Sequence, residues 1–172
     1  PFGENGFAVL EDNVAVEFNI PPAHNHTEFI NHIQTVMNKL QQELPQMEFS
    51  TESAVIFDTD QLQHPAALEF GCDPDYNAWT CELNPRPNAS EQNLRSAGGH
   101  IHIGTDLDPI QVIRAMDLFL GVPSIKLDHG TLRRQLYGKA GAFRPKSYGC
   151  EYRTLSNFWI FDKKLIEWEN NE

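Results

Sequence analysis

The sequence predicts an α+β domain in which a largely antiparallel sheet carries helices on one face and leaves a polar face open. The chain has 172 residues, of which 40% are hydrophobic, enough for one core, so we expect a single domain over residues 1–172. Its candidate strands alternate apolar and polar residues, whereas the strands of a parallel doubly wound sheet are apolar almost throughout. Amphipathic helical segments lie between these strands and can pack on their shared apolar face.

The first two strands form the predicted start of the domain. Residues 7–10 favour a strand, and after a turn the apolar side chains of residues 14–20 share one face of a second strand. Glu17 and Asn19 lie on its other face, where their polar groups are available for chemistry. The two prolines at 21–22 end this strand.

The segment after these prolines predicts an amphipathic helix. Asn25 with Glu28 three residues on resembles a capping box, and apolar residues then recur at helical spacing as far as Leu44. Pro45 stops the helix. The next segment, residues 48–57, is rich in β-branched and aromatic residues and predicts a strand.

Residues 71–93 hold three prolines among Asp, Asn and Ser, so we expect a long irregular loop, and loops of this length are often functional. Further on, Asp108 and Pro109 begin a helix that Gly121 and Pro123 should end. The spacing predicts a core face for this helix made of Ile110, Ile113, Met116, Phe119 and Leu120. A short last helix is predicted over residues 162–169.

Two imidazoles share one face of a short strand near the middle of the chain. In the run from Gly98 to Gly104, Ile101 and Ile103 can enter a core while His100 and His102 project together from the opposite face. Taken alone, the pattern fits a half-buried strand with two solvent-facing histidines equally well.

A later strand, residues 150–155, places a carboxylate and a guanidinium on one face, those of Glu151 and Arg153. We expect one sheet with one apolar face to gather these two groups with the two histidines and Glu17. Such a face would hold two carboxylates, two imidazoles and an arginine.

Charge is unevenly distributed along the chain. The formal net charge of −11 argues against a general basic surface for nucleic acid. Residues 126–153, however, hold seven basic and two acidic residues, a local balance of +5, which suits a concentrated anion such as a polyphosphate. We therefore expect an anion-binding loop before the Glu151 strand; the alternative is a basic surface loop that balances an acidic body. The basic residues are Lys126, Arg133, Arg134, Lys139, Arg144, Lys146 and Arg153.

The chain shows no run of about 18 apolar residues that could span a membrane and no signal-peptide pattern at its start. We therefore expect a cytoplasmic protein with no membrane partner.

Four ordered blocks, residues 10–19, 95–104, 134–144 and 148–157, resemble the phage-type carboxylate-amine ligases. These amidoligases are related to glutamine synthetase and glutamate-cysteine ligase. The resemblance implies a glutamine synthetase-like catalytic domain in the cytoplasm of a phage-infected bacterium. It also implies an enzyme that uses ATP to phosphorylate a small-molecule or peptide carboxylate and lets an amine displace the phosphate.

The resemblance also assigns roles to residues. Mg²⁺, with Mn²⁺ as an alternative, would be bound by Glu17, Glu151, one of the two histidines and the acidic partner Asp12. His100 resembles the metal ligand and His102 the residue that faces nucleotide phosphate, although the two could be exchanged. The implied catalytic residues are Arg153, Arg144 and Arg134, and the implied nucleotide-binding residues are His102, Arg133, Lys139 and Arg144.

The chain departs from the family pattern at its start. It begins at Pro1 and lacks the acidic Asp-Pro-Glu strand that supplies further metal ligands, so we expect a domain without its N-terminal strand. Asp73-Pro74-Asp75 does not replace that strand, because it lies in the predicted loop.

Two alternatives remain open. A degenerate ligase would bind a nucleotide or metal without turnover, and nucleotide-dependent phosphate release would distinguish the enzyme from it. A cupin-like metal oxygenase could use His-x-His with a later glutamate, and iron dependence would reveal it. The sequence leaves the carboxylate, the amine and the oligomeric state undecided.

Overall fold

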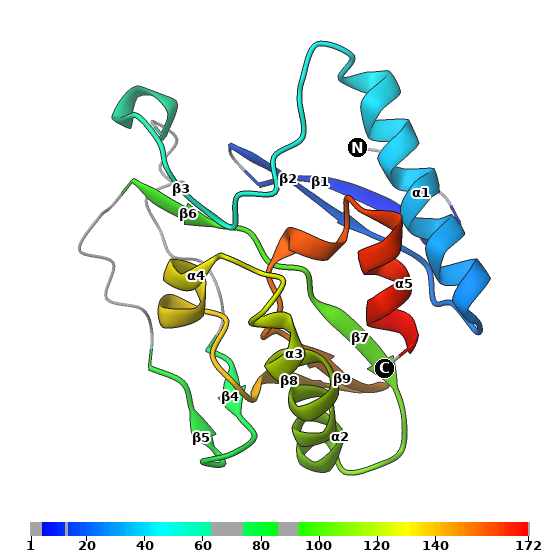
Figure 1. The fold of residues 1–172 in the computed structure, drawn as a ribbon, viewed down its shortest axis with the longest axis vertical. Coiled ribbons are helices and arrows are strands. Elements are labelled where there is room, and N and C mark those ends of the chain that lie inside the picture. Colours follow the sequence, from blue (N-terminus) through cyan, green and yellow to red (C-terminus); the bar gives the residue numbers. More distant parts are fainter. Residues whose placement is uncertain (1–4, 13, 63–73, 86–92, 172) are drawn as a thin grey trace.

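The computed structural model describes residues 5–12, 14–62, 74–85 and 93–171, which form the predicted α+β fold (Figure 1). The strands are β1 (Ala8–Asp12), β2 (Ala15–Asn19), β3 (Ala54–Ile56), β4 (Tyr76–Asn77), β5 (Glu82–Leu83), β6 (Leu94–Ser96), β7 (Ile101–Gly104), β8 (Ala142–Lys146) and β9 (Gly149–Tyr152). The α-helices are α1 (His26–Glu43), α2 (Pro109–Met116), α3 (Val122–Ser124), α4 (Thr131–Leu136) and α5 (Lys163–Asn171). Short turns of other helix types are η1 (Thr59–Leu62), η3 (Asp117–Gly121) and η4 (Asn157–Trp159).

All pairings between these strands are antiparallel, as predicted. Five strands form the main sheet in the order β5-β4-β8-β9-β7. Two smaller sheets, β1-β2 and β3-β6, are separate from it among the described residues. The expectation that one sheet gathers all the chemical residues is therefore wrong for Glu17, because its strand, β2, pairs with β1 alone in the described part of the chain.

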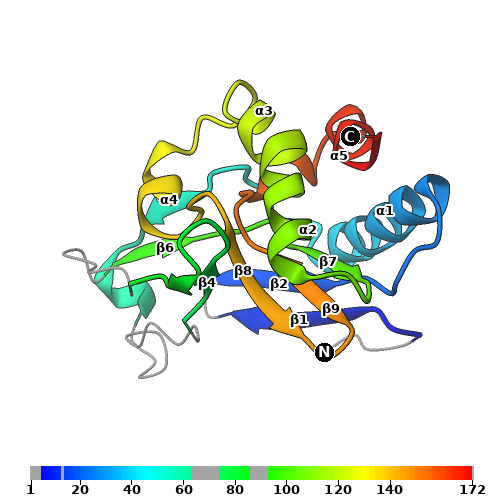
Figure 2. The same cartoon turned by 90° about the horizontal axis from the view of Figure 1, so that it is seen from below.

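The register of the main sheet sorts its side chains onto two faces. Glu151 on β9 lies opposite His102 on β7 and opposite Arg144 on β8, so these three side chains share a face. Tyr152, the next residue, lies opposite Ile101 and Phe143 and points into the core, where helix α2 packs against β8 and β9 (Figure 2). The predicted arrangement of helices on an apolar face is confirmed for this sheet.

Helix α1 begins as the capping pattern predicts. The Asn25 side chain accepts a hydrogen bond from the backbone N–H of Glu28 at 2.9 Å, and the Glu28 carboxylate accepts one from the backbone N–H of His24 at 2.8 Å. The helix packs against α5, and the Phe29 ring stacks on the Trp159 ring with 6.2 Å between centroids. This helix pair extends the core around α2.

Helix α2 also begins as predicted, with Asp108 as its cap, but it does not end at Gly121. It continues through the π-helical turn η3 into α3. A π turn adds a residue to the helical repeat, so it changes which of the positions beyond Met116 face the core. Phe119 was expected in the core and is 55% exposed, whereas Leu120 is buried at 5%.

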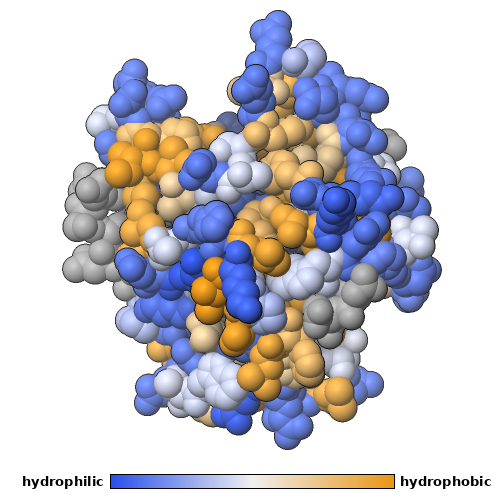
Figure 3. Space-filling model, viewed as in Figure 1, coloured by the Kyte–Doolittle hydropathy of each residue, from blue (hydrophilic) through white to orange (hydrophobic). Residues whose placement is uncertain are grey.

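The π turn brings its backbone close to β9. A Cβ atom on Gly121 would lie 2.5 Å from the Tyr152 hydroxyl, so only glycine fits there without displacement. The buried Asp117 carboxylate accepts hydrogen bonds from the Tyr152 hydroxyl at 2.7 Å and from the Trp79 indole N–H at 2.5 Å. The turn thus fastens α2 to the sheet. Around η3 and α3, apolar side chains remain exposed on the surface of the molecule (Figure 3).

Three loop and strand predictions need correction. The expected strand over 48–57 is limited to β3, since only residues 54–56 find a partner, in β6. Of the expected irregular loop 71–93, the described part 74–85 forms the β4-β5 hairpin, while 71–73 and 86–92 lie outside the described residues. The expected basic loop contains α4 and β8. The predicted last helix is confirmed as α5.

Within the described residues, no helix is both long and apolar enough to cross a membrane.

Candidate functional site

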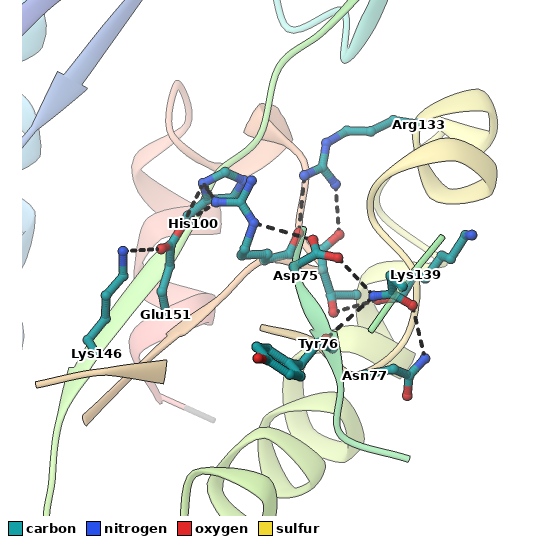
Figure 4. A network of polar contacts seen from close by, with 11 residues as sticks. Asp75, Tyr76, Asn77, His100, Arg133, Lys139, Lys146 and Glu151 are labelled. Carbon is teal, nitrogen blue, oxygen red and sulfur yellow. Dashed lines mark hydrogen bonds and ion pairs between the residues drawn. The ribbon is translucent and has the colours of Figure 1, made fainter. Parts of the chain in front are cut away.

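The Glu151 carboxylate lies at the centre of a charged cluster on the polar face of the main sheet (Figure 4). Its side chain is on β9 and the residue is only 3% exposed. One carboxylate oxygen lies 2.8 Å from the Lys146 ammonium, and the other contacts the Arg153 guanidinium and lies 3.4 Å from Nδ1 of His100. Both oxygens are therefore already engaged by cations.

Arg153 lies between two carboxylates. It is 9% exposed, and besides its contact with Glu151 its Nε lies 3.4 Å from the Asp75 carboxylate, an ion-pair distance without hydrogen-bond alignment. The Asn84 side chain donates a hydrogen bond to the other oxygen of Asp75 at 2.9 Å. Asp75 directly precedes β4, so the β4-β5 hairpin supplies the second anchor of the guanidinium.

Arg133 of α4 is buried behind this cluster, at 2% exposed. Its guanidinium donates to the backbone carbonyls of Thr154 at 2.8 Å and Arg153 at 3.1 Å. A Cβ atom on Gly138 would lie 2.2 Å from Nη1 of Arg133, which shows how closely the chain wraps this side chain. Burial, followed by the charge of Arg153, lowers the pKa of Arg133 to about 10, so the guanidinium is charged at neutral pH.

Burial and the neighbouring charges set the protonation states of His100 and Glu151. Burial first, then the positive charges of Arg153 and Arg133, lowers the pKa of His100 to about 3, so its imidazole is neutral at pH 7. Burial alone would raise the pKa of Glu151, but the hydrogen bond from Lys146 and the charge of Arg153 outweigh it and lower that pKa to about 2. The site is thus an ionised carboxylate surrounded by cations.

His102 lies at the exposed edge of the same face. Its Nδ1 is 2.5 Å from the Tyr148 hydroxyl oxygen, and the two rings stack with 6.1 Å between centroids. Burial lowers the pKa of His102. Arg144 faces Glu151 from β8, and its charge contributes to lowering the pKa of His100. The structure therefore brings His100, His102, Arg144, Glu151 and Arg153 to one face.

Two other predicted residues point elsewhere. Arg134 forms an ion pair with Asp128 at 3.0 Å and donates to its backbone carbonyl at 2.9 Å, contacts that tie α4 to the preceding turn. The Lys139 side chain points away from His100 and Glu151 (Figure 4), while its backbone carbonyl accepts a hydrogen bond from the Thr154 hydroxyl at 3.0 Å.

Asp12 and Glu17 lie on the separate β1-β2 hairpin, where both are exposed. Within the part of the chain that the structure describes, neither carboxylate makes a hydrogen bond or an ion pair. No three His, Cys, Asp or Glu side chains among the described residues form a group that could hold a metal ion. The structure does not bring the four expected ligands together there.

Sequence reasoning gave no site role to three neighbours of the site. Lys146 was expected only as one of the basic residues of the anion-binding loop, although it is two residues from Arg144 and therefore on the same face of a strand. Asp75 precedes a strand of only two residues, too short for an alternating pattern to reveal. Tyr148 lies in the turn between β8 and β9, where no periodicity applies.

The fold and the site together define an α+β protein with a cluster of cationic side chains around a buried carboxylate on one face of an antiparallel sheet. Residues 86–167, just under half of the chain, match the family model described as phage phiEco32-like COOH-NH2 ligase, type 2. The resemblance to the carboxylate-amine ligases is thereby confirmed, and the family name indicates a ligase. The matched segment contains every predicted site residue except Asp12 and Glu17.

No match was found among curated proteins or among solved structures. The kinship with glutamine synthetase remains a prediction.

Proposed function

We propose that this protein is an ATP-dependent carboxylate-amine ligase that works through an acyl-phosphate intermediate. One observation carries the proposal: Arg144, Lys146 and Arg153 converge on one sheet face inside the segment that matches the ligase family. Preorganised cations in a partly dry site are the groups that stabilise a transferring phosphoryl group.

The proposed reaction has two steps. A substrate carboxylate oxygen attacks the terminal phosphorus of ATP, which forms the acyl phosphate and releases ADP. The amine nitrogen then attacks the acyl carbon, the bond from carbon to the phosphate oxygen breaks, and inorganic phosphate leaves as the amide forms. The protons that the amine loses pass to solvent.

The cations have distinct roles in this proposal. Arg153 and Arg144 contact the phosphoryl oxygens, and Arg153 is held for this role between Glu151 and Asp75. Arg133 acts through its bonds to the backbone of Arg153 and Thr154, so it is a positioning residue.

Three further roles come from the resemblance alone. His102 and Lys139 would reach the nucleotide, and Arg134 would act in catalysis only after leaving Asp128.

Mg²⁺, with Mn²⁺ as an alternative, is the metal that the resemblance implies, held by Asp12, Glu17, His100 and Glu151. The described residues do not fit that set, since two of these side chains lie on a separate hairpin and Glu151 is engaged by Lys146 and Arg153. The roles given above therefore rest on side chains of this chain alone.

The proposed substrates are a small-molecule or peptide carboxylate and an amine, with no nucleic acid or membrane partner. The proposed location is the cytoplasm, that of the bacterial host if a phage encodes the protein.

Hydroxylamine provides the direct test, because it is a small amine that attacks an acyl phosphate and forms a hydroxamate. Iron(III) is then added and gives a coloured complex with the hydroxamate, which can be measured. The full chain would be incubated with ATP, MgCl₂, hydroxylamine and a panel of amino acids, dipeptides and dicarboxylates. We expect hydroxamate and ADP in equal amounts with at least one carboxylate, and their loss in Arg153→Gln. ATP binding without hydroxamate or ADP on any carboxylate would contradict the proposal and favour the degenerate binding module.

A further inference from the structure

The helix formed by α2, η3 and α3 has an apolar face that the other described residues leave exposed. The three parts follow one another without a break from residue 109 to residue 124. On one side of this helix, Ile113 and Leu120 are buried in the core. On the other side, Leu118 and Val122 are each more than half exposed. Figure 3 shows the apolar surface that results around η3 and α3.

The spacing of the exposed residues is that of a helix pair. Ala115, Leu118, Val122 and Ile125 are all exposed, and successive members are three, four and three positions apart. An average of about 3.5 residues is the repeat of the apolar residues along which two α-helices pack. Phe119 is exposed beside them and widens the face. These five residues are called the exposed seam below. Single exposed apolar residues are ordinary, whereas a continuous group of them indicates an interaction site.

The two ends of the exposed seam carry opposite charges. Asp106 and Asp108 are exposed just before α2, and Lys126 is exposed directly after the seam. The charged residues between them are engaged elsewhere: Asp117 is buried, and Arg114 donates a hydrogen bond to a backbone carbonyl of the β4-β5 hairpin at 2.9 Å. The exposed positions of the seam are therefore apolar in the middle, negative at one end and positive at the other.

A second copy of the chain that runs in the opposite direction complements this charge pattern. In a two-fold contact each copy presents the same patch, so Lys126 of each copy meets Asp106 and Asp108 of the other, and the apolar middle meets itself. The candidate site stays accessible in this arrangement. Helix α2 packs against the core face of the main sheet, whereas Glu151 lies on the opposite, polar face (Figure 2).

We propose that two copies of this chain associate through the exposed seam, as an antiparallel pair of helices about a two-fold axis near Leu118. The inference goes beyond the proposed function and does not depend on it. One helix from each copy makes a small interface, and the formal net charge of −11 on each copy opposes association. We therefore expect a dissociation constant on the order of 100 µM, so that the chain is mostly monomeric at about 5 µM.

Sedimentation velocity of the full chain from about 5 to 500 µM measures the association directly. We expect the weight-average sedimentation coefficient to rise from that of a monomer toward that of a dimer. Leu118→Glu should weaken the association about tenfold or more, because it places two like charges together near the axis. Met47→Glu makes the same change in charge at an exposed apolar residue outside the seam and is the matched control. Circular dichroism confirms that both variants fold.

Two outcomes of this experiment would overturn the inference. One is an unmodified chain that stays monomeric up to the highest concentration. The other is an association that folded Leu118→Glu leaves unchanged, which would place the contact on another surface.

Lys126→Glu tests the antiparallel direction. It places like charges opposite each other in an antiparallel pair, so we expect association about tenfold weaker than in the control Lys164→Glu, which reverses an exposed lysine outside the seam. Adding Asp106→Lys to Lys126→Glu should restore part of the loss. In a parallel pair Lys126 would lie beside its own copy, so an effect no larger than that of the control would refute the antiparallel arrangement.

Discussion

Two glutamates on similar strand patterns, Glu151 and Glu17, have opposite environments. Each lies on a strand whose neighbouring residues point to the other face, yet Glu151 is buried among cations and Glu17 is exposed on a two-stranded hairpin. The difference comes from the neighbouring strands: β9 has partners on both sides, while β2 pairs with β1 alone in the described part of the chain. Alternation places a side chain on a face, and the strand order decides what surrounds it.

The largest effect should follow from removing the buried carboxylate. Glu151→Ala removes the partner of Lys146 and leaves Arg153 with Asp75 alone, and we expect the free energy of unfolding to fall by about 3 kcal/mol. Glu17→Ala, the matched change on the hairpin, should alter it by less than about 0.5 kcal/mol. Urea denaturation followed by circular dichroism measures both. Equal effects would show that the two glutamates do not differ as described.

The next prediction concerns the hydrogen bonds that the buried Asp117 carboxylate accepts from Tyr152 of β9 and from Trp79. Asp117→Ala removes the acceptor for the Tyr152 hydroxyl and the Trp79 indole, and we expect a loss of about 2 kcal/mol because a buried donor loses its partner. Asp106→Ala, at an exposed position, serves as the control. A loss no greater than that of the control would mean that this carboxylate does not fasten α2 to the sheet.

Lowering the pH should reduce the free energy of unfolding in two stages, the first through His100 and the second through Glu151. His100 binds its proton only near pH 3 in the folded chain but near its ordinary pKa of 6.5 when unfolded, so stability falls as the pH drops from about 6.5 to 3. The stability that Glu151 contributes is present above its ordinary pKa of 4.5 and is lost as the pH falls through about 2.

Denaturation curves at successive pH values test the first stage. In His100→Asn the loss between pH 6.5 and 3 should become smaller, whereas His129→Asn, at an exposed position, should follow the unmodified chain. An unchanged slope in His100→Asn would contradict the assigned environment of this histidine.

A smaller contrast lies in η3, where two neighbouring apolar residues differ in burial, as the two glutamates do. Leu120→Ala should lower the free energy of unfolding by about 2 kcal/mol because the side chain is buried. Phe119→Ala should lower it by less than about 1 kcal/mol because that side chain is exposed. The same urea experiment compares them. A greater loss for Phe119→Ala than for Leu120→Ala would contradict this assignment and favour the core face with Phe119 that the sequence predicts.

Patterns that depend on local spacing were predictable, and features that depend on distant partners were not. The cap at Asn25, the start of α2 and the alternation around Glu151 follow from neighbours a few residues apart. The β4-β5 hairpin is too short to show a period, and a π turn has no distinct spacing in the sequence.

The candidate site divides in the same way. The shared face of Glu151 and Arg153 could be predicted from alternation, because it depends only on the period of one strand. That His102 lies on the same face of the sheet depends also on the pairing of β7 with β9. The contact of Arg153 with Asp75 could not, since it depends on where a hairpin 78 positions earlier in the chain folds back. Glu17 was grouped with these residues because the strand order cannot be read from one strand's pattern.

The most direct test of the central claim is a calorimetric titration of ATP into the full chain in MgCl₂, repeated with Arg153→Gln and with Lys126→Gln as the control. An ATP-dependent ligase whose site is the cationic face of the main sheet should bind ATP, lose about tenfold or more of its affinity in Arg153→Gln, and keep it in Lys126→Gln. Failure of the unmodified chain to bind ATP, or undiminished binding by folded Arg153→Gln, would contradict the account.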